Sequence, residues 1–501
     1  MNHSKSFEAL LPFLKKIRRY GHEISLINYD LETCAPEKAL EEEGNLINQI
    51  QAEYAALFVE KEFKKALKNL LKDKKANEYE HRLGEILYKQ VELLEKMPLE
   101  EYNKANEAFT TSNVMWRKYK ASGDYESWLP YFEETIKWSK KIAQYKQKKG
   151  QTPYEALLND YEEGASEASI DAVFTELKEA IVALLPEVNE RQSNYHYHAL
   201  PPVGYSNQLA LSYDLLKLIK YDLKGGAIRT STHPFSDDIA RHDARLTTKY
   251  DFYDFRSNLF TTLHEGGHCM EFQNKPEEQY EHFLERSFAY SIAETHSRFY
   301  ENILGKSIEL SPKLYELVRK DLGSAFEHWD GEWGFYHALT KVEPGLIRCE
   351  ADELTYSLHI IIRYEIEKDI INGKLEAKDI PAVWNQKYKD YLGVDVPNNG
   401  VGCMQDTHWT AGSFGYFPTY ALGNLYGAMI LEKMKETLDV PALLKEGNLE
   451  PIREWFATND FPFDHLKPKD WIMKVAGKEL SATPFIEYLK AKYGKDADNK
   501  E

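Results

Sequence analysis

The chain has 501 residues, of which 43% are hydrophobic and 29% are charged, and its formal net charge at pH 7 is −18. This composition is typical of a soluble globular protein with room for two or three ordinary domains or one large helical body. The acidic balance argues against a nucleic-acid-binding surface, because phosphate binding needs a basic face.

Neither a membrane span nor a targeting segment is predicted. No run of about 18 apolar residues occurs, and the apolar residues of positions 1–20 are spaced as on one helix face. Four cysteines are too few for a disulfide scaffold: Cys34, Cys269, Cys349 and Cys403. We predict that all four are buried free thiols and that the protein is cytoplasmic.

Residues 6–150 have an almost wholly helical pattern, with breaks at Pro36, 73–77, Pro98 and 122–123. The charged stretches 54–72 and 78–96 could form a coiled-coil arm. They contain no sustained heptad, so packed antiparallel helices are favoured.

The next hundred residues change in character. A short helix is predicted over 152–162 and a strong one over 169–190, followed by a loop over 193–202. Residues 227–232 and 244–250 have the β-branched and aromatic content of strands. We predict a small sheet beside the helix that follows, with an edge strand able to pair with an extended peptide.

That helix contains the motif H-E-x-x-H at residues 264–268. Residues four apart lie one above the other on a helix, so His264 and His268 can direct two imidazoles at one point. Glu265 lies about 100° further round and can reach a metal-bound water without being a ligand. Two neutral imidazoles suit Zn²⁺. The alternative is a pair of surface histidines on a polar helix face.

Two features around the motif favour the metal site. Residues 254–263 have an apolar helix side. Gly266 and Gly267 each cost a helix interior about 1 kcal/mol relative to alanine. We infer that the backbone here lies close to something else, such as a substrate.

A zinc site needs a third protein ligand, and we predict Glu294 on a returning helix over 283–304. His296 competes with it but points nearly opposite on a helix. Glu285 and His282 are poorer candidates because they lie close to the turn. Further helices are predicted over 311–323, 348–372 and 381–391, with a loop over 393–402 and a helical remainder.

Six motifs, in order along most of the chain, resemble the M32 metallocarboxypeptidase family, named after the Thermus carboxypeptidase. They are His233-Pro234-Phe235, Asp243-Ala244-Arg245-Leu246-Thr247, His264-Glu265-Gly266-Gly267-His268, Ile347-Arg348-Cys349-Glu350-Ala351-Asp352, Gly402-Cys403-Met404-Gln405-Asp406-Thr407-His408-Trp409 and Tyr416-Phe417-Pro418-Thr419-Tyr420. Two patterns depart from the family. Its H-E-S/G-Q appears as Ala293-Glu294-Thr295-His296, and its W-D-x-x-T-x-M-P appears as Tyr29 to Pro36. Such changes around a ligand can alter metal affinity roughly 10–100-fold.

The resemblance implies a mainly α, saddle-like fold with a deep central groove, formed as one catalytic domain over 1–501. Within it, 1–150 would be a helical N-terminal subregion and 151–501 would hold the metal site. It further implies a homodimer, Zn²⁺ with Co²⁺ or Mn²⁺ as substitutes, and removal of single C-terminal residues from peptides with broad specificity. Neither a nucleic acid nor a membrane is expected as a partner.

In the expected mechanism Glu265 takes a proton from water and passes it to the leaving amine. His233, His408 and Tyr420 are candidate donors to the oxyanion, although Tyr420 could be core and His408 a structural histidine. Arg348 is the first candidate to grip the substrate carboxylate and Arg245 the second.

Alternatives stay open both for the role of Arg348 and for the function of the protein. Asp352, four residues after Arg348, could hold that arginine in a structural ion pair. Asp243, Asp352 and Asp406 are interpreted as supporting carboxylates. For function, a zinc endo-oligopeptidase or dipeptidyl peptidase on a related scaffold is the first rival. The second is a helical interaction protein with a vestigial motif, which the intact Glu265 argues against.

Overall fold

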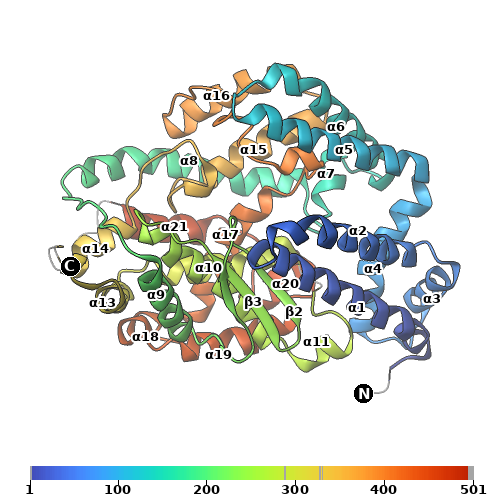
Figure 1. The fold of residues 1–501 in the computed structure, drawn as a ribbon, viewed down its shortest axis with the longest axis horizontal. Helices are drawn as coiled ribbons and strands as arrows, with labels where there is room; N and C mark the ends of the chain where they lie inside the picture. The colour runs from blue at the N-terminus through green and yellow to red at the C-terminus, as the bar shows by residue number, and fades with distance from the viewer. Residues whose placement is uncertain (1–2, 287–288, 327–328, 330, 495–501) are drawn as a thin grey trace.

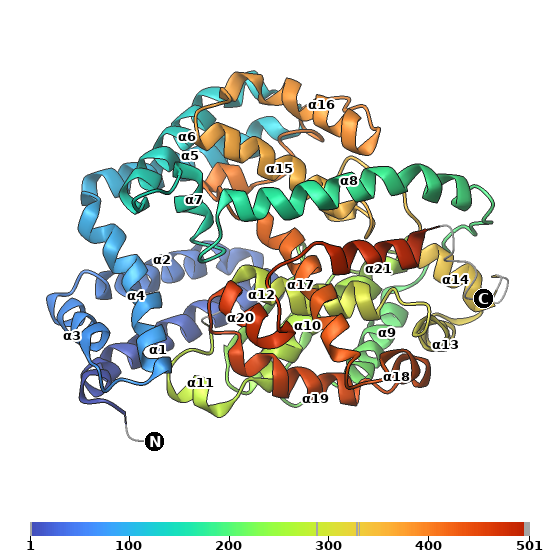
Figure 2. The ribbon, with the colours of Figure 1, turned by 180° about the vertical axis from the view of Figure 1, so that it is seen from behind.

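The computed structural model describes residues 3–286, 289–326, 329 and 331–494. The described chain is mainly helical (Figures 1 and 2). It contains one small sheet, which Figure 1 shows beside α10. The predicted mainly α fold is therefore confirmed. Within the described ranges, no helix has the length and apolar character that crossing a membrane would require.

The first four helices pack around a small hydrophobic core of their own. Their bounds are α1 Lys5–Thr33, α2 Leu40–Leu57, α3 Lys61–Lys72 and α4 Glu78–Lys96. The core is formed by buried residues such as Phe7, Leu67 and Val91, and it includes Leu284 from the later chain. The helix predicted over 78–96 is confirmed, with Asn77 as its N-cap. The prediction of one helix over 54–72 is wrong, because the chain turns at residues 58–60, between α2 and α3. No glycine or proline marks this turn in the sequence.

A larger core begins with the next helices and extends to the end of the described chain. These helices are α5 Leu99–Lys120, α6 Tyr125–Lys146, α7 Pro153–Leu158, α8 Glu167–Gln192 and α9 Tyr205–Leu218. Helices α7 and α8 confirm the predictions for this region. Each begins at a side-chain cap, Thr152 for α7 and Ser166 for α8.

The sheet has the strand order β1-β3-β2, with β1 Ile228–Thr230 parallel and β2 Ser236–Ala240 antiparallel to β3 Asp243–Thr248. The sequence predicts β1 and β3. It does not predict β2, whose Ser-Asp-Asp opening resembles a turn. Strands β2 and β3 pack against α10, Phe255–Asn274. The predicted sheet beside the metal helix is therefore confirmed.

The chain leaves α10 through α11, Glu277–Glu281, and returns as α12, Tyr290–Arg298, which continues as a π-helical segment, Phe299–Leu304. The predicted helix over 283–304 therefore starts later, at Tyr290; positions 287–288 of that prediction lie outside the described residues.

The rest of the chain wraps around α17, Pro418–Met434, which is buried along most of its length. Helix α15 begins at Tyr356 and not at Arg348, because residues 348–350 form a separate 3-10 turn. Figure 2 shows α8 and α21 lying side by side. The remaining bounds are α13 Ser311–Leu322, α14 Gly331–Leu339, α15 Tyr356–Ile371, α16 Ile380–Leu392, α18 Val440–Glu446, α19 Glu450–Asn459, α20 Pro468–Ala476 and α21 Thr483–Tyr493.

The cysteine prediction is right about bonding and half wrong about burial. All four thiols are free, and Cys269 and Cys403 are buried. Cys34 and Cys349 are exposed, because Cys34 follows the end of α1 and Cys349 lies in the short turn before α15.

The two glycines of α10 admit neighbouring helices and not a substrate. A Cβ on Gly267 would lie 2.8 Å from the backbone of His296 and Ser297 in α12. A Cβ on Gly266 would lie 2.6 Å from the Ile219 side chain, just after α9. The inference of a close backbone approach is correct, but its partner is the protein itself.

We predict that Gly267→Ala destabilises the protein by about 1–3 kcal/mol, because backbone cannot yield to a methyl group as a side chain can. Gly44→Ala is the matched control: Gly44 lies inside α2 with nothing within 4 Å of its added Cβ. It should gain about 0.5–1 kcal/mol from helix propensity. Thermal melting, monitored by circular dichroism, should show a lower melting temperature for Gly267→Ala and a higher one for Gly44→Ala. Equal changes in melting temperature for the two variants would contradict the close-packing account.

Candidate metal centre and active site

Helices α10 and α12 bring the three predicted metal ligands together. The nearest donor atoms of His264, His268 and Glu294 all lie within 4.8 Å of one another. His264 Nε2 is 3.9 Å from Glu294 Oε2, and the two imidazole rings meet edge to face with centroids 5.1 Å apart. One residue from each turn of α10 and one from the facing helix thus converge on a point.

A carboxylate behind His264 fixes the orientation of its ring. His264 Nδ1 lies 2.8 Å from Glu301 Oε2 in the π-helical segment, and Arg298 Nη1 donates to the same oxygen at 3.0 Å. Because a carboxylate accepts, Nδ1 carries the proton and Nε2 presents its lone pair toward Glu294. Glu301 and Arg298 are not among the site residues predicted from the sequence. Their signal is the spacing Glu294, Arg298, Glu301, which places all three on one helix side.

The protonation state of His268 suits a divalent cation. Burial, reinforced by the neighbouring His264, lowers the pKa of His268 to about 4, so its imidazole is neutral at physiological pH. Two imidazole nitrogens and one carboxylate match the donor set of catalytic zinc sites, which leave a further position open. The residues present therefore fit a metal ion of this kind.

Glu265 is buried beside these residues without belonging to the three-donor group. Burial raises the pKa of Glu265 to about 7, although the nearby His264 opposes the shift. A carboxylate with a pKa near the working pH can accept a proton and later return it.

His296 points away from the candidate metal ligands, as predicted. It is fully buried, with Nδ1 2.6 Å from Glu271 Oε2 and Nε2 3.3 Å from Asp460 Oδ2. Burial alone would lower the pKa of His296, but Asp460 and Glu271 raise it to about 10. The imidazolium thus links α12 to α10 and to the residue after α19.

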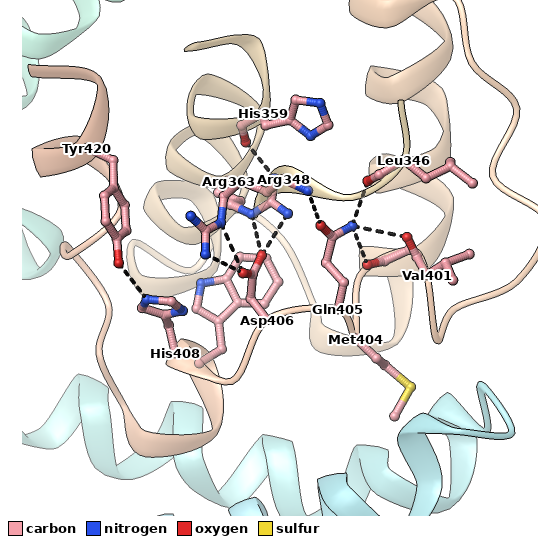
Figure 3. Close-up of polar contacts among 12 residues, drawn as sticks. Leu346, Arg348, His359, Arg363, Val401, Met404, Gln405, Asp406, His408 and Tyr420 are labelled. Atoms are coloured by element: carbon pink, nitrogen blue, oxygen red, sulfur yellow. Dashed lines mark hydrogen bonds and ion pairs between the residues drawn. The ribbon is translucent and has the colours of Figure 1, made fainter. Parts of the chain in front are cut away.

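His408 and Tyr420 form a second group of polar atoms (Figure 3). The Tyr420 hydroxyl lies 3.3 Å from His408 Nε2. Burial, followed by the charge of Arg348, lowers the pKa of His408 to about 4. Burial also keeps the pKa of Tyr420 well above its ordinary value. Both groups are therefore neutral at pH 7, and in the bond between them one donates and the other accepts.

Asp406 holds Arg348 from one side, as Figure 3 shows. Arg348 Nε and Nη2 donate to Asp406 Oδ1 at 3.0 and 2.9 Å, and Arg363 Nε donates to Oδ2 at 2.7 Å. The alternative that Asp352 pairs with Arg348 is wrong, because that carboxylate accepts from Thr355 and from the backbone of Glu343.

The guanidinium of Arg348 also lies near Tyr420, which with His408 forms the donor pair. Its carbon lies 5.0 Å from the centroid of the Tyr420 ring, and Nη1 lies 3.3 Å from the Tyr356 hydroxyl. Two arginines hold the pKa of Asp406 well below its usual range against the effect of burial. Asp406 is therefore an anion that fixes two buried cations.

The structure places the other two candidates apart from this group. Arg245 donates twice to Asp243 on its own strand, at 2.7 and 2.6 Å, and its guanidinium lies 5.1 Å from the Tyr29 ring centroid. It faces a cavity of about 790 Å³ between the end of α1 and the sheet. His233 is exposed in the loop before β2, where its carbonyl accepts from Ser231.

Comparison with known proteins connects this site to a family. Residues 9–493 match the family model described as "Carboxypeptidase Taq (M32) metallopeptidase". Carboxypeptidase 1 of Bacillus subtilis is 34% identical over 96% of both chains. Thermostable carboxypeptidase 1 of Thermus thermophilus is 33% identical over 77% of this chain and 78% of its own. The solved structure of Trypanosoma cruzi metallocarboxypeptidase 1 covers 98% of this chain and 99% of its own at 28% identity, with a TM-score of 0.93.

We predict that Asp406→Asn lowers the free energy of unfolding by about 3–5 kcal/mol, because it leaves two buried guanidinium groups without their counter-ion. Asp395→Asn is the matched control. Asp395 pairs with Lys389 at the surface, where its side chain is 85% exposed, and such pairs contribute at most about 1 kcal/mol. Chemical denaturation of both variants measures the difference; a loss for Asp406→Asn no larger than the control's would refute the buried-pair account.

Proposed function

The chain belongs to the carboxypeptidase Taq (M32) metallopeptidase family, and from that premise we propose that His264, His268 and Glu294 hold the metal of a metallocarboxypeptidase. The convergence of these three donors within 4.8 Å carries the proposal. The named relatives are carboxypeptidases, which disfavours an endo-oligopeptidase or dipeptidyl peptidase. The substrate is a peptide, from which the enzyme releases single C-terminal residues with broad specificity.

When bound, a Zn²⁺ ion would lower the pKa of a coordinated water and polarise the scissile carbonyl. Glu265 acts as the base: its buried carboxylate takes a proton from the attacking water. It then gives that proton to the amine that leaves as the peptide bond breaks. The raised pKa of Glu265 suits both steps, because neither transfer is strongly uphill near neutral pH.

Neutral donors can stabilise the oxyanion that forms on the carbonyl oxygen. Tyr420 and His408 are the best candidates, because both stay uncharged and the hydrogen bond between them leaves one donor, either Tyr420 O–H or His408 Nδ1–H, for the oxyanion. His233 is a weaker candidate, since its side chain is exposed in a loop.

The substrate's terminal carboxylate needs a cation. Arg348 is the first candidate because it stacks on Tyr420 and Asp406 sets its orientation. Arg245 is second, because it pairs with Asp243 on its own strand and lines the cavity by the end of α1, apart from Tyr420 and His408.

Three finer properties complete the proposal. Zn²⁺ is the native metal, with Co²⁺ or Mn²⁺ as substitutes, since two imidazoles and a carboxylate suit these ions. A cytoplasmic location is supported by four cysteines that are all free. A homodimer is supported by the family resemblance of the sequence motifs.

Glu265→Gln should lower kcat about 10²–10⁴-fold while leaving one metal ion at the site, because the amide cannot accept the proton. A time course with a mixed-sequence peptide, followed by mass spectrometry and metal analysis, tests this. Wild type should remove C-terminal residues one at a time. Glu281→Gln, an exposed glutamate after α10, is the control and should match wild type. Internal cleavage products would overturn the carboxypeptidase proposal.

Arg348→Lys should raise KM about 10–100-fold for peptides with a free C-terminal carboxylate, because a lysine cannot form the paired hydrogen bonds of a guanidinium. The KM for the same peptides with a C-terminal amide should change little. The ratio by which the enzyme prefers the free acid over the amide should therefore become smaller. An equal loss for acid and amide would indicate a structural role only. Arg245→Lys is measured in the same way. If Arg245 binds the carboxylate, this variant and not Arg348→Lys would show the smaller preference for the free acid.

A further inference from the structure

A second group of metal-binding side chains lies outside the active site. His3, Glu80 and His282 offer one ligand atom each, and these atoms all lie within 4.8 Å of one another. They come from three separate segments: the residues before α1, the first turn of α4 and the residue that follows α11. Glu80 and His282 are buried.

Hydrogen bonds hold His282 in the tautomer that a metal requires. His282 Nδ1 lies 2.7 Å from the Glu278 carbonyl, which only accepts, so Nδ1 carries the proton. Nε2 accepts from Asn77 Nδ2 at 3.1 Å. The Asn77 amide cannot be reversed, because its Oδ1 accepts from the Glu80 N–H at 2.9 Å. Nε2 therefore carries the lone pair, which an ion would take over from the Asn77 amide, and a carbonyl behind Nδ1 is the usual support of a histidine ligand.

The carboxylate of Glu80 lacks a strong counter-charge. Backbone N–H groups of Ser4 and Asn77 donate to its two oxygens at 3.0 and 3.3 Å. Within the described part of the chain, no lysine or arginine forms an ion pair with it, and its one such contact is with His3. Burying a carboxylate without a charged partner is costly, and a divalent cation would supply that partner.

The spacing of His3 and Glu80 suits a shared ion. His3 Nδ1 lies 3.4 Å from Glu80 Oε1, and this buried nitrogen has no hydrogen-bond partner among the described residues. Two ligand atoms, each about 2.0–2.1 Å from a tetrahedral Zn²⁺, lie about 3.3 Å apart. A cluster satisfied by hydrogen bonds alone would leave this nitrogen without a partner.

Aromatic rings keep both imidazoles in position. Tyr79 stacks on His282 with ring centroids 5.1 Å apart, and Phe7 stacks on His3 at 4.5 Å. Phe7 and the nearby Leu284 belong to the small core of α1 to α4. Packing against these rings thus holds both histidines in position.

We propose that His3, Glu80 and His282 form a second zinc site, with water at the fourth position. The ion ties the segment before α1 and the start of α4 to the connection between α11 and α12. Helix α12 carries Glu294, so the site joins the N-terminal helices to the part of the chain that supplies the active site. This inference does not depend on the proposed catalytic roles.

Zinc stoichiometry of the full-length chain, measured by mass spectrometry of metals after dialysis, tests the site. Wild type should hold two zinc ions per chain, and the double variant His264→Ala/His268→Ala should hold one. Adding His282→Gln or His3→Gln to the double variant should remove the remaining ion. His81→Gln, on the residue next to Glu80, is the matched control and should keep it.

Thermal melting gives a readout independent of stoichiometry and activity. Zinc should raise the melting temperature of the double variant, and His3→Gln should abolish that rise. His3 has a partly exposed side chain, so its replacement leaves the fold intact even where His282→Gln does not. A double variant that binds no zinc, or one that keeps its ion after His3→Gln, would overturn the second site. Loss of the catalytic ion alone would leave it standing.

Discussion

The close contact between α10 and α12 at Gly267 is the constraint on which the candidate active site depends. His268 follows Gly267 directly, and Glu294 lies on the helix that the glycine faces. A side chain at this position would push α12 away, and the carboxylate of Glu294 would move with it. A glycine that weakens an isolated helix by about 1 kcal/mol therefore provides the separation that the donor atoms need. The stability lost locally is recovered by packing between the helices.

Buried charges then fix the two helices in register. On the far side of the contact, His296 of α12 bridges Glu271 of α10 and Asp460. Lys275 extends the network, lying 3.1 Å from Glu271 and 3.0 Å from Asp464. Such pairs add little net stability over apolar packing, but breaking one is costly, so they favour a single geometry. The departure from the family motif at His296 thus has a structural explanation: the imidazolium has its own carboxylate partners and faces away from the candidate metal ligands.

Much of the fold and of the metal group could be predicted from sequence, because both depend on local periodicity. The spacing of His264 and His268 fixes their common helix face, and capping residues such as Asn77 mark where helices begin. Contacts between distant segments could not be predicted in this way. Nothing near Arg348 indicates that its partner is Asp406, 58 residues later, and Asp352 satisfied every local criterion. Strand β2 was missed for a related reason, since its pairing with β3 overrides a polar sequence. Likewise, the sequence indicates His282 only as a poor candidate ligand of the active-site metal. The fold places it beside His3 and Glu80, which are distant in the sequence.

Helix α17 contacts both groups of the candidate active site, the metal ligands and the pair Tyr420 and His408. Its Gly423 packs against the backbone of Glu294, where an added Cβ would come within 2.9 Å. One turn earlier on the same helix, Tyr420 reaches His408 and stacks on Arg348. A candidate metal ligand and a candidate oxyanion donor are therefore held by neighbouring turns of one buried helix. Because that helix is enclosed along most of its length, it can shift only as a unit. The positions of Glu294 and Tyr420 relative to each other are thus set by helix packing, which is the kind of preorganisation that electrostatic catalysis uses.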